Sequence, residues 1–240
     1  MESSAPMFVI KNNTYIIIVM LNYLTFFTVF EIQCLFFAAA CLSKDQEMPW
    51  KSMCLFLFVT CASELSGIYL KRQHHANQWP YNILLVFQIL FISYMFYGLL
   101  KKNSIGKLAV QGGFAILTIL YIIDICLHGF FWFNVLTYNS MSVVLVIYSL
   151  FYFYLLLKQD EIVHLKYSAG FWWVCGVLFF YFGDTAVNIF RGKLSVIMIT
   201  PKHALPYYIL VVLNIILYSC WTYSFICRKW LTTKSEILSS

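Results

Sequence analysis

Residues 81–100 read YNILLVFQILFISYMFYGLL, twenty consecutive positions without a charged side chain, and Lys101 and Lys102 follow them. The hydrocarbon core of a bilayer is about 30 Å thick and takes about 20 apolar residues of α-helix. This stretch therefore predicts a helix that crosses a membrane and ends at the two lysines.

The rest of the chain repeats this pattern. Of the 240 residues, 62% are hydrophobic and 11% are charged, whereas soluble domains carry roughly 25% charged residues. We therefore predict an all-α fold, a single transmembrane domain over residues 1–240, built as a polytopic bundle of about seven helices with short loops. The spans are expected at about 15–42, 52–70, 81–100, 108–128, 141–157, 168–190 and 207–227.

The basic residues indicate an orientation and a kind of partner. Ten of the 16 lysines and arginines fall on the side of the membrane that holds the C-terminus, and the richer side is usually cytoplasmic. We therefore expect an integral, multi-pass protein with a non-cytoplasmic N-terminus, a cytoplasmic C-terminus and no cleaved signal peptide. Basic residues that stand singly or in pairs at helix ends favour contact with membrane lipids and argue against nucleic acid as a partner.

A few polar side chains interrupt the apolar spans. Ionisable residues within spans tend to face the interior of a bundle and to mark functional sites. Antiparallel threading brings most of these side chains to a similar depth in the non-cytoplasmic half, so we predict that they line a shared cavity. They are Thr60, Ser63, Glu64, Asn82, Gln88, Asp124, His128, Asp184, Asn188 and Asn214, while the register of Glu31 and Gln33 in the long first run stays open.

Helical spacing supports this cavity, because residues three and four positions apart share a face. Asp184, Asn188 and Arg191 form one such face, and Asn214, Tyr218 and Trp221 form another. A structural alternative exists for most of these residues: the amides can join packed helices, and Asp184 can pair with Arg191.

Glu64 has the weakest structural alternative, because no basic residue lies within one helical turn of it. A buried neutral acid can donate a proton, and a second carboxyl group can accept one or stabilise charge. We predict Glu64 as the proton donor and Asp184 as the base or charge partner of an enzyme that acts on a hydrophobic small molecule, a lipid or isoprenoid, with neither a cofactor nor a metal. The expected substrate contacts are Asn82, Gln88, Asn188, Asn214, Tyr218 and Trp221.

The layout resembles the small seven-span terpene cyclases of fungal meroterpenoid pathways. Those enzymes place a catalytic Glu in span two, where this chain has Cys61-Ala62-Ser63-Glu64. Their second catalytic acid lies in span seven in a Leu-Asp-Ile-like context, and this chain departs from that pattern with Leu213-Asn214-Ile215. The resemblance implies acid-initiated cyclisation of an isoprenoid, with Glu64 as the acid.

A second resemblance is to small, uncharacterised seven-span proteins of bacteria. They are similar in the Ser-Glu of span two, in Trp79-Pro80-Tyr81-Asn82 and in Phe171-Trp172. This resemblance implies the architecture and no activity.

Two other function classes remain open from the sequence. A non-enzymatic seven-helix sensor, carrier or partner-binding module needs only a polar cavity, although the chain lacks the paired broken helices that favour a carrier. A metal-dependent membrane hydrolase would use histidine and carboxylate ligands. Its candidates on one side of the membrane are His74, His75, Asp124, His128 and His203.

Overall fold

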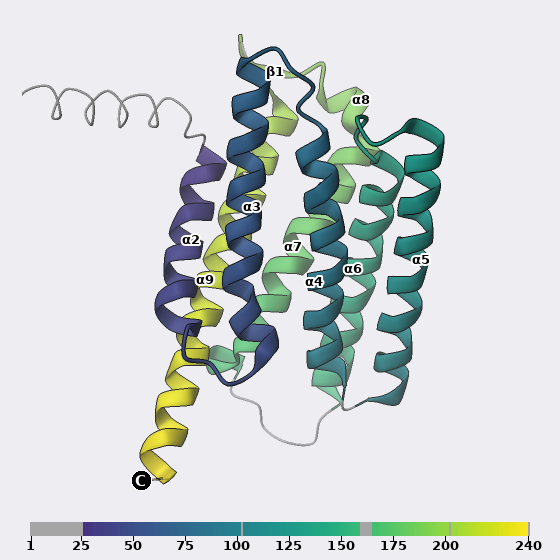
Figure 1. The fold of residues 1–240 in the computed structure, drawn as a ribbon. Helices are drawn as coiled ribbons and strands as arrows, with labels where there is room; N and C mark the ends of the chain where they lie inside the picture. Colours follow the sequence, from purple (N-terminus) through teal and green to yellow (C-terminus); the bar gives the residue numbers. More distant parts are fainter. Residues whose placement is uncertain (1–25, 102, 159–164, 202, 240) are drawn as a thin grey trace, which may run out of the picture.

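The computed structural model describes residues 26–101, 103–158, 165–201 and 203–239, which form an almost entirely helical structure (Figure 1). Six of their helices are long and apolar enough to cross a membrane. These are α3 (Met48–Arg72), α4 (Trp79–Leu100), α5 (Ser104–His128), α6 (Val135–Leu157), α7 (Ala169–Ile189) and the part of α9 (Leu205–Ser239) up to Trp230. The predicted all-α, multi-pass membrane bundle is thus confirmed for the described residues.

The helix α2 (Phe26–Leu42) is apolar but shorter than the other six. The first part of the run predicted at 15–42 lies outside the described residues. Within them, α2 packs against both α3 and α9, so it belongs to the bundle.

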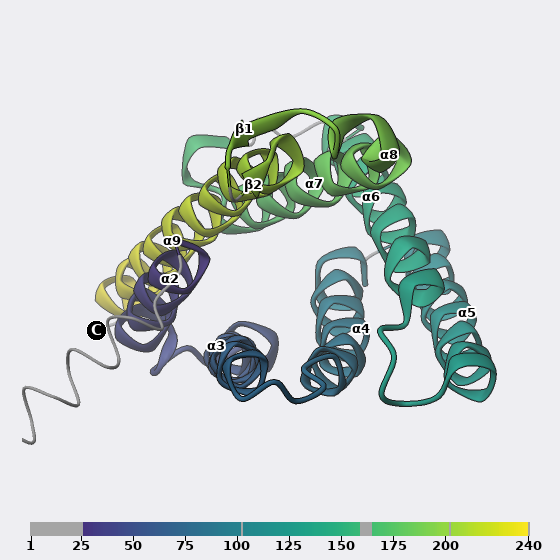
Figure 2. The ribbon, with the colours of Figure 1, turned by 90° about the horizontal axis from the view of Figure 1, so that it is seen from above.

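The helices form a closed ring. Each helix from α2 to α6 packs against the α-helix that follows it in the chain, and the short helix η1 (Leu165–Tyr167) lies between α6 and α7 in the sequence. The helix α9 closes the ring by packing against both α7 and α2. Seen from above in Figure 2, α3 and α4 lie across the ring from α7 and α9. Side chains from helices far apart in the sequence can therefore meet at the centre.

The connection between α7 and α9 is structured rather than a short loop. It contains α8 (Arg191–Leu194) and a small antiparallel pair of strands, β1 (Met198–Thr200) and β2 (His203–Ala204). Together with the α3–α4 and α5–α6 connections, it lies at one end of the bundle (Figure 1). We call this the α3–α4 loop end.

The helix α6 begins six residues earlier than the predicted span, at Val135 instead of 141. The start of this helix mixes the polar residues Thr137, Asn139 and Ser140 with apolar ones, which is why hydropathy alone places the span later. In the structure, Thr137 donates hydrogen bonds from its backbone N–H and its hydroxyl to Asp124 of α5, both at 3.1 Å. Buried donors are stable when they are satisfied, so Asp124 supports this early start.

Aromatic side chains pack in the centre of the helix bundle, away from the α3–α4 loop end. Trp173 is fully buried and stacks on Trp221, with ring centroids 6.0 Å apart and an interplanar angle of 4°. Phe56 contacts Trp221 edge-on and stacks on Phe91 at 4.4 Å. Such pairs add about 0.5–1.5 kcal/mol each beyond the burial of their area, and they form a packed floor under the cavity described below.

An ion pair fastens the α2–α3 loop to α9 at the opposite end of the bundle. Arg228 Nε and Nη2 lie 2.7 and 3.1 Å from the two carboxylate oxygens of Asp45. Arg228 also pairs with Glu47 at 3.0 Å and lies over the ring of Trp50. A two-point contact of this kind has fixed geometry, so it sets the position of α2 and α3 against α9.

Candidate functional site

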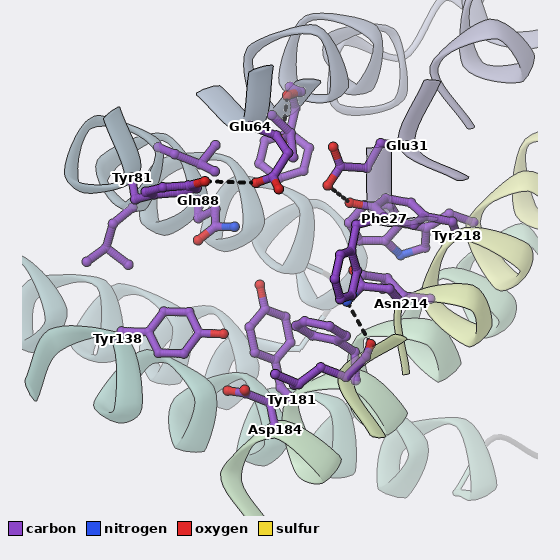
Figure 3. Close-up of a pocket in the computed structure, with 18 of the residues that line it drawn as sticks. Phe27, Glu31, Glu64, Tyr81, Gln88, Tyr138, Tyr181, Asp184, Asn214 and Tyr218 are labelled. Carbon is purple, nitrogen blue, oxygen red and sulfur yellow. Dashed lines mark hydrogen bonds between the residues drawn. The ribbon is translucent and has the colours of Figure 1, made fainter. Parts of the chain in front are cut away.

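The helices enclose a cavity of about 410 Å³ in the half nearer the α3–α4 loop end (Figure 3). Its lining contains three carboxyl groups, each from a different helix: Glu31 of α2, Glu64 of α3 and Asp184 of α7. It also contains nine aromatic rings, from Phe27, Phe56, Tyr81, Phe133, Tyr138, Phe180, Tyr181, Tyr218 and Trp221. Acids and aromatic faces thus share one cavity, which is partly open to the surroundings.

Glu64 is half-buried and has one hydrogen-bond partner in the cavity. The hydroxyl of Tyr81, in the first turn of α4, donates to Glu64 Oε2 at 3.2 Å (Figure 3). The ring of Tyr81 reaches Glu64 because Gly67, one turn further along α3, leaves room for it. The absence of a side chain at Gly67 therefore positions the acid's partner.

This close approach makes Gly67→Ala a test of the Tyr81–Glu64 pair. A Cβ at this position would overlap the Tyr81 hydroxyl and lie 2.7 Å from the ring carbon that bears it. We expect a loss of about 1–3 kcal/mol in the free energy of unfolding, because overpacking displaces the ring. Unfolding of the purified protein in detergent measures the change.

Gly112→Ala on α5 is the matched control, since a Cβ there has no atom within 4 Å. It should be neutral or stabilise the protein by up to about 1 kcal/mol, because alanine is the better helix former. Equal effects of the two substitutions would contradict the proposed role of Gly67.

Asp184 is buried, with 3% of its surface exposed, and has several partners. Asn188 Nδ2 donates to its Oδ2 at 3.1 Å, and the hydroxyl of Ser142 donates to the same oxygen at 3.4 Å. Tyr138 and Arg191 also interact with the carboxyl group. Hydrogen-bond donors and a guanidinium group thus surround this carboxyl group.

The predicted face of Asp184, Asn188 and Arg191 exists. Arg191 Nη2 donates to Asn188 Oδ1 at 2.6 Å, and Asn188 in turn donates to Asp184. Asp184 and Arg191 line the cavity, whereas Asn188 does not. Asn188 therefore connects the arginine to the acid and is not a lining residue.

Six of the eight predicted site residues line this one cavity: Glu64, Gln88, Asp184, Asn214, Tyr218 and Trp221. Asn214 Nδ2 donates to the backbone oxygen of Leu210, one turn before it. Thr60 also lines the cavity, with its hydroxyl bonded to the backbone oxygen of Phe56.

Asn82 is not part of the cavity lining and has a structural role. It is fully buried, and its Nδ2 donates to the backbone oxygens of Phe130 and Trp132 at 2.6 and 2.7 Å. Its Oδ1 accepts a hydrogen bond from the backbone of Asn134. Asn82 thus holds the loop that joins α5 and α6.

Asp124 and His128 also lie outside the cavity lining. Asp124 is 1% exposed, and its Oδ1 lies 2.9 Å from His128 Nδ1 while its Oδ2 binds Thr137. These contacts join α5 to α6. Among the described residues, no three histidine, cysteine or acidic side chains gather in a group that could hold a metal ion.

Glu31 is the lining acid that sequence reasoning did not select. It is 6% exposed, and the hydroxyl of Tyr218 donates to its Oε1 at 2.8 Å (Figure 3). Its other carboxyl oxygen, Oε2, is buried and has no hydrogen-bond partner in the part of the chain that the structure describes. The sequence contained a signal, because Cys34 and Ala38 continue the helical face of Glu31 with small residues. Both are fully buried in the structure.

Known proteins supply no assignment for this site. Comparison with the profiles of protein families, with curated proteins and with solved structures finds no match to the chain. The function must therefore be inferred from the cavity itself.

Proposed function

We propose that this protein is an integral membrane enzyme that protonates a hydrophobic isoprenoid or lipid substrate, with Glu64 as the proton donor. The observation that carries the proposal is the joint lining of one cavity by three carboxyl groups and nine aromatic rings. A positioned acid accelerates protonation, and aromatic faces stabilise the positive charge that protonation creates. A volume of about 410 Å³ also lies in the usual range for small-molecule sites.

The proposed step transfers the proton of the Glu64 carboxyl group to one carbon of a substrate double bond. The electron pair of that double bond forms the new carbon–hydrogen bond, and the neighbouring carbon becomes a cation. Attack by a second double bond of the substrate then closes a ring. Loss of a proton from an adjacent carbon restores a double bond, so the overall reaction is an isomerisation and needs no oxidant or cofactor.

Asp184 is the charge partner in this mechanism. It lies on α7, across the ring of helices from α3 and Glu64 (Figure 2). Opposite charges interact strongly in a medium of low dielectric constant, so a carboxylate on that side stabilises a substrate cation. Asn214 and Gln88 orient the substrate, and Tyr218 and Trp221 present their rings to it.

The resemblance to seven-span terpene cyclases supports the same chemistry through Glu64 alone. Asn214 stands where those enzymes have an acid, and an amide cannot exchange a proton as a carboxyl group does. The proposed reaction therefore needs a base other than residue 214.

Incorporation of deuterium from solvent tests the proposed activity. The purified protein in lipid nanodiscs would be incubated in D2O with farnesyl and geranylgeranyl alkenes and their terminal epoxides. Proton-initiated cyclisation of an alkene adds a deuteron to carbon, which mass spectrometry of the product detects, and epoxides give cyclic alcohols. Unchanged substrate across this panel would count against the enzyme.

A binding module without chemistry is the second candidate. The hydrogen bonds that Tyr218, Tyr81 and Asn188 make to the three carboxyl groups favour it, since a lining held in place by its own bonds suits recognition. Retention of unmodified isoprenoid or lipid by the purified protein, with no product in D2O, would support this candidate over the enzyme.

The proposal includes seven spans, with the apolar run at 15–42 as the first, and a cytoplasmic C-terminus. The packing of α2 against α3 and α9 supports this arrangement. The outward faces of the helices carry large exposed apolar side chains, such as Ile119 and Phe179, that suit contact with lipid. Reporter proteins fused to the C-terminus would test the orientation, and activity of a reporter that works only outside the cytoplasm would contradict it.

A further inference from the structure

Glu31 differs from the other two acids of the cavity in having a buried carboxyl oxygen without a partner. Asp184 accepts hydrogen bonds from Ser142 and Asn188, whereas Glu31 accepts one, from Tyr218. Glu31 is 6% exposed, and its Oε2 is buried with no hydrogen-bond partner among the described residues. A buried polar atom without a partner is costly, so this oxygen is suited to exchange a proton or to meet a polar group of a ligand.

Glu31 also lies next to the proposed proton donor. It belongs to α2 and Glu64 to α3, two helices that pack together, and both side chains point into the cavity (Figure 3). Two like charges so placed are unfavourable together, and a pair of this kind tends to share a proton.

The other titratable groups around Glu31 do not compete for this role. The hydroxyl of Tyr218 of α9 donates a hydrogen bond to Glu31, and the hydroxyl of Tyr81 of α4 donates one to Glu64. Cys34 on the same helix and Cys61 of α3 are the neighbouring thiols, and a thiol surrounded by apolar groups stays neutral. The described cation that lines the cavity, Arg191, bonds to Asn188 beside Asp184.

We infer that Glu31 and Glu64 form a proton-exchanging pair, in which Glu31 takes the proton that the substrate loses and returns it to Glu64. The inference rests on the proposed function for the substrate steps. When a carbon–hydrogen bond of the cation breaks, its electron pair forms the product double bond and its proton moves to Glu31 Oε2. Transfer of that proton to the Glu64 carboxylate restores the starting state.

Infrared titration tests the pair without any substrate. The carbonyl stretching band of protonated carboxyl groups would be followed against pH in the purified protein, in H2O and D2O. Glu31→Gln and Glu64→Gln should each remove one component and move the midpoint of the other by about one pH unit or more, as coupled groups do. Gln33→Ala, at an exposed position of the same helix, should leave both midpoints unchanged. Independent midpoints in the two variants would overturn the inference.

The number of product molecules formed per protein tests which acid donates the proton and which accepts it. Under conditions where the wild type converts many equivalents of substrate, Glu31→Gln should release at most one equivalent of product per protein, because the pair cannot be reset. Glu64→Gln should form product about 10²–10⁴-fold more slowly from the first turnover onward. Repeated turnover by Glu31→Gln at the wild-type rate would overturn the assignment of roles.

The two experiments separate the inference from the proposed function. If the wild type forms no product, the proposed function fails, and the infrared titration still decides whether Glu31 and Glu64 share a proton. If Glu31→Gln does not fold, Tyr218→Phe keeps both carboxyl groups and removes the donor to Glu31. That variant should move the Glu31 midpoint and, through the coupling, the Glu64 midpoint, and a change in neither would contradict the pair.

Discussion

Replacement of Glu64 with Gln is expected to lower the rate of product formation by a factor of about 10²–10⁴, the usual contribution of a positioned general acid. Glutamine keeps the shape of the side chain and can still accept a hydrogen bond from the Tyr81 hydroxyl, which lies 3.2 Å from Glu64. It carries no proton that can be transferred to a substrate carbon. The loss should therefore appear in kcat, with little change in the binding of substrate.

Two controls accompany Glu64→Gln. Tyr81→Phe removes the hydroxyl that bonds to Glu64 but keeps the acid, so its effect on the rate should be clearly smaller. The thermal unfolding temperature of the Gln variant should match that of the wild type. A stable Glu64→Gln protein with wild-type product formation would end the enzymatic proposal and leave the binding module.

Replacement of Asp45 with Asn is expected to lower the free energy of unfolding by about 3 kcal/mol, the lower end of the range for breaking a buried ion pair. The side chain of Asp45 is 2% exposed, and both of its oxygens contact Arg228. The variant leaves Arg228 with its contact to Glu47 and with partial access to solvent, which keeps the loss at that lower end. Denaturant unfolding in detergent measures it.

Glu47→Gln is the matched control for Asp45→Asn, because it removes the other carboxylate that binds Arg228. The side chain of Glu47 is 57% exposed, and exposed pairs contribute about 0–1 kcal/mol. A loss for Glu47→Gln equal to that for Asp45→Asn would show that burial does not set the strength of this contact.

Residues 81–100 show that hydropathy can predict the position of a membrane-spanning helix. The run is apolar, begins after Pro80 and ends at Lys101, and the helix observed there, Trp79–Leu100, starts within two residues of the expectation. The helix α6 begins six residues before the predicted span, and Thr137 near its start is bound by Asp124 of another helix. Hydropathy measures the preference of a segment for lipid, and it contains no information on a partner that satisfies a polar turn.

Asn82 and Glu31 show the same limit for the candidate site. Both are single polar residues in apolar runs, and the rule that such residues face the interior holds for both, with exposures of 0% and 6%. The rule does not distinguish an interior position that holds a loop from one that lines a cavity. Asn82 meets the backbone of the α5–α6 connection, whereas Glu31 meets Tyr218, 187 residues away in the chain.

The amino-acid sequence by itself predicted apolar spans suited to a membrane, their helical form and the similar level of most polar side chains along the bundle. It could do so because the cost of exposing a polar group to hydrocarbon depends on local composition. Only the tertiary structure decided which side chains meet. The closing of the ring by α9 against α2 and α7 brings Glu31, Glu64 and Asp184 into one cavity. That juxtaposition arises from helix packing between distant segments, which no local pattern encodes.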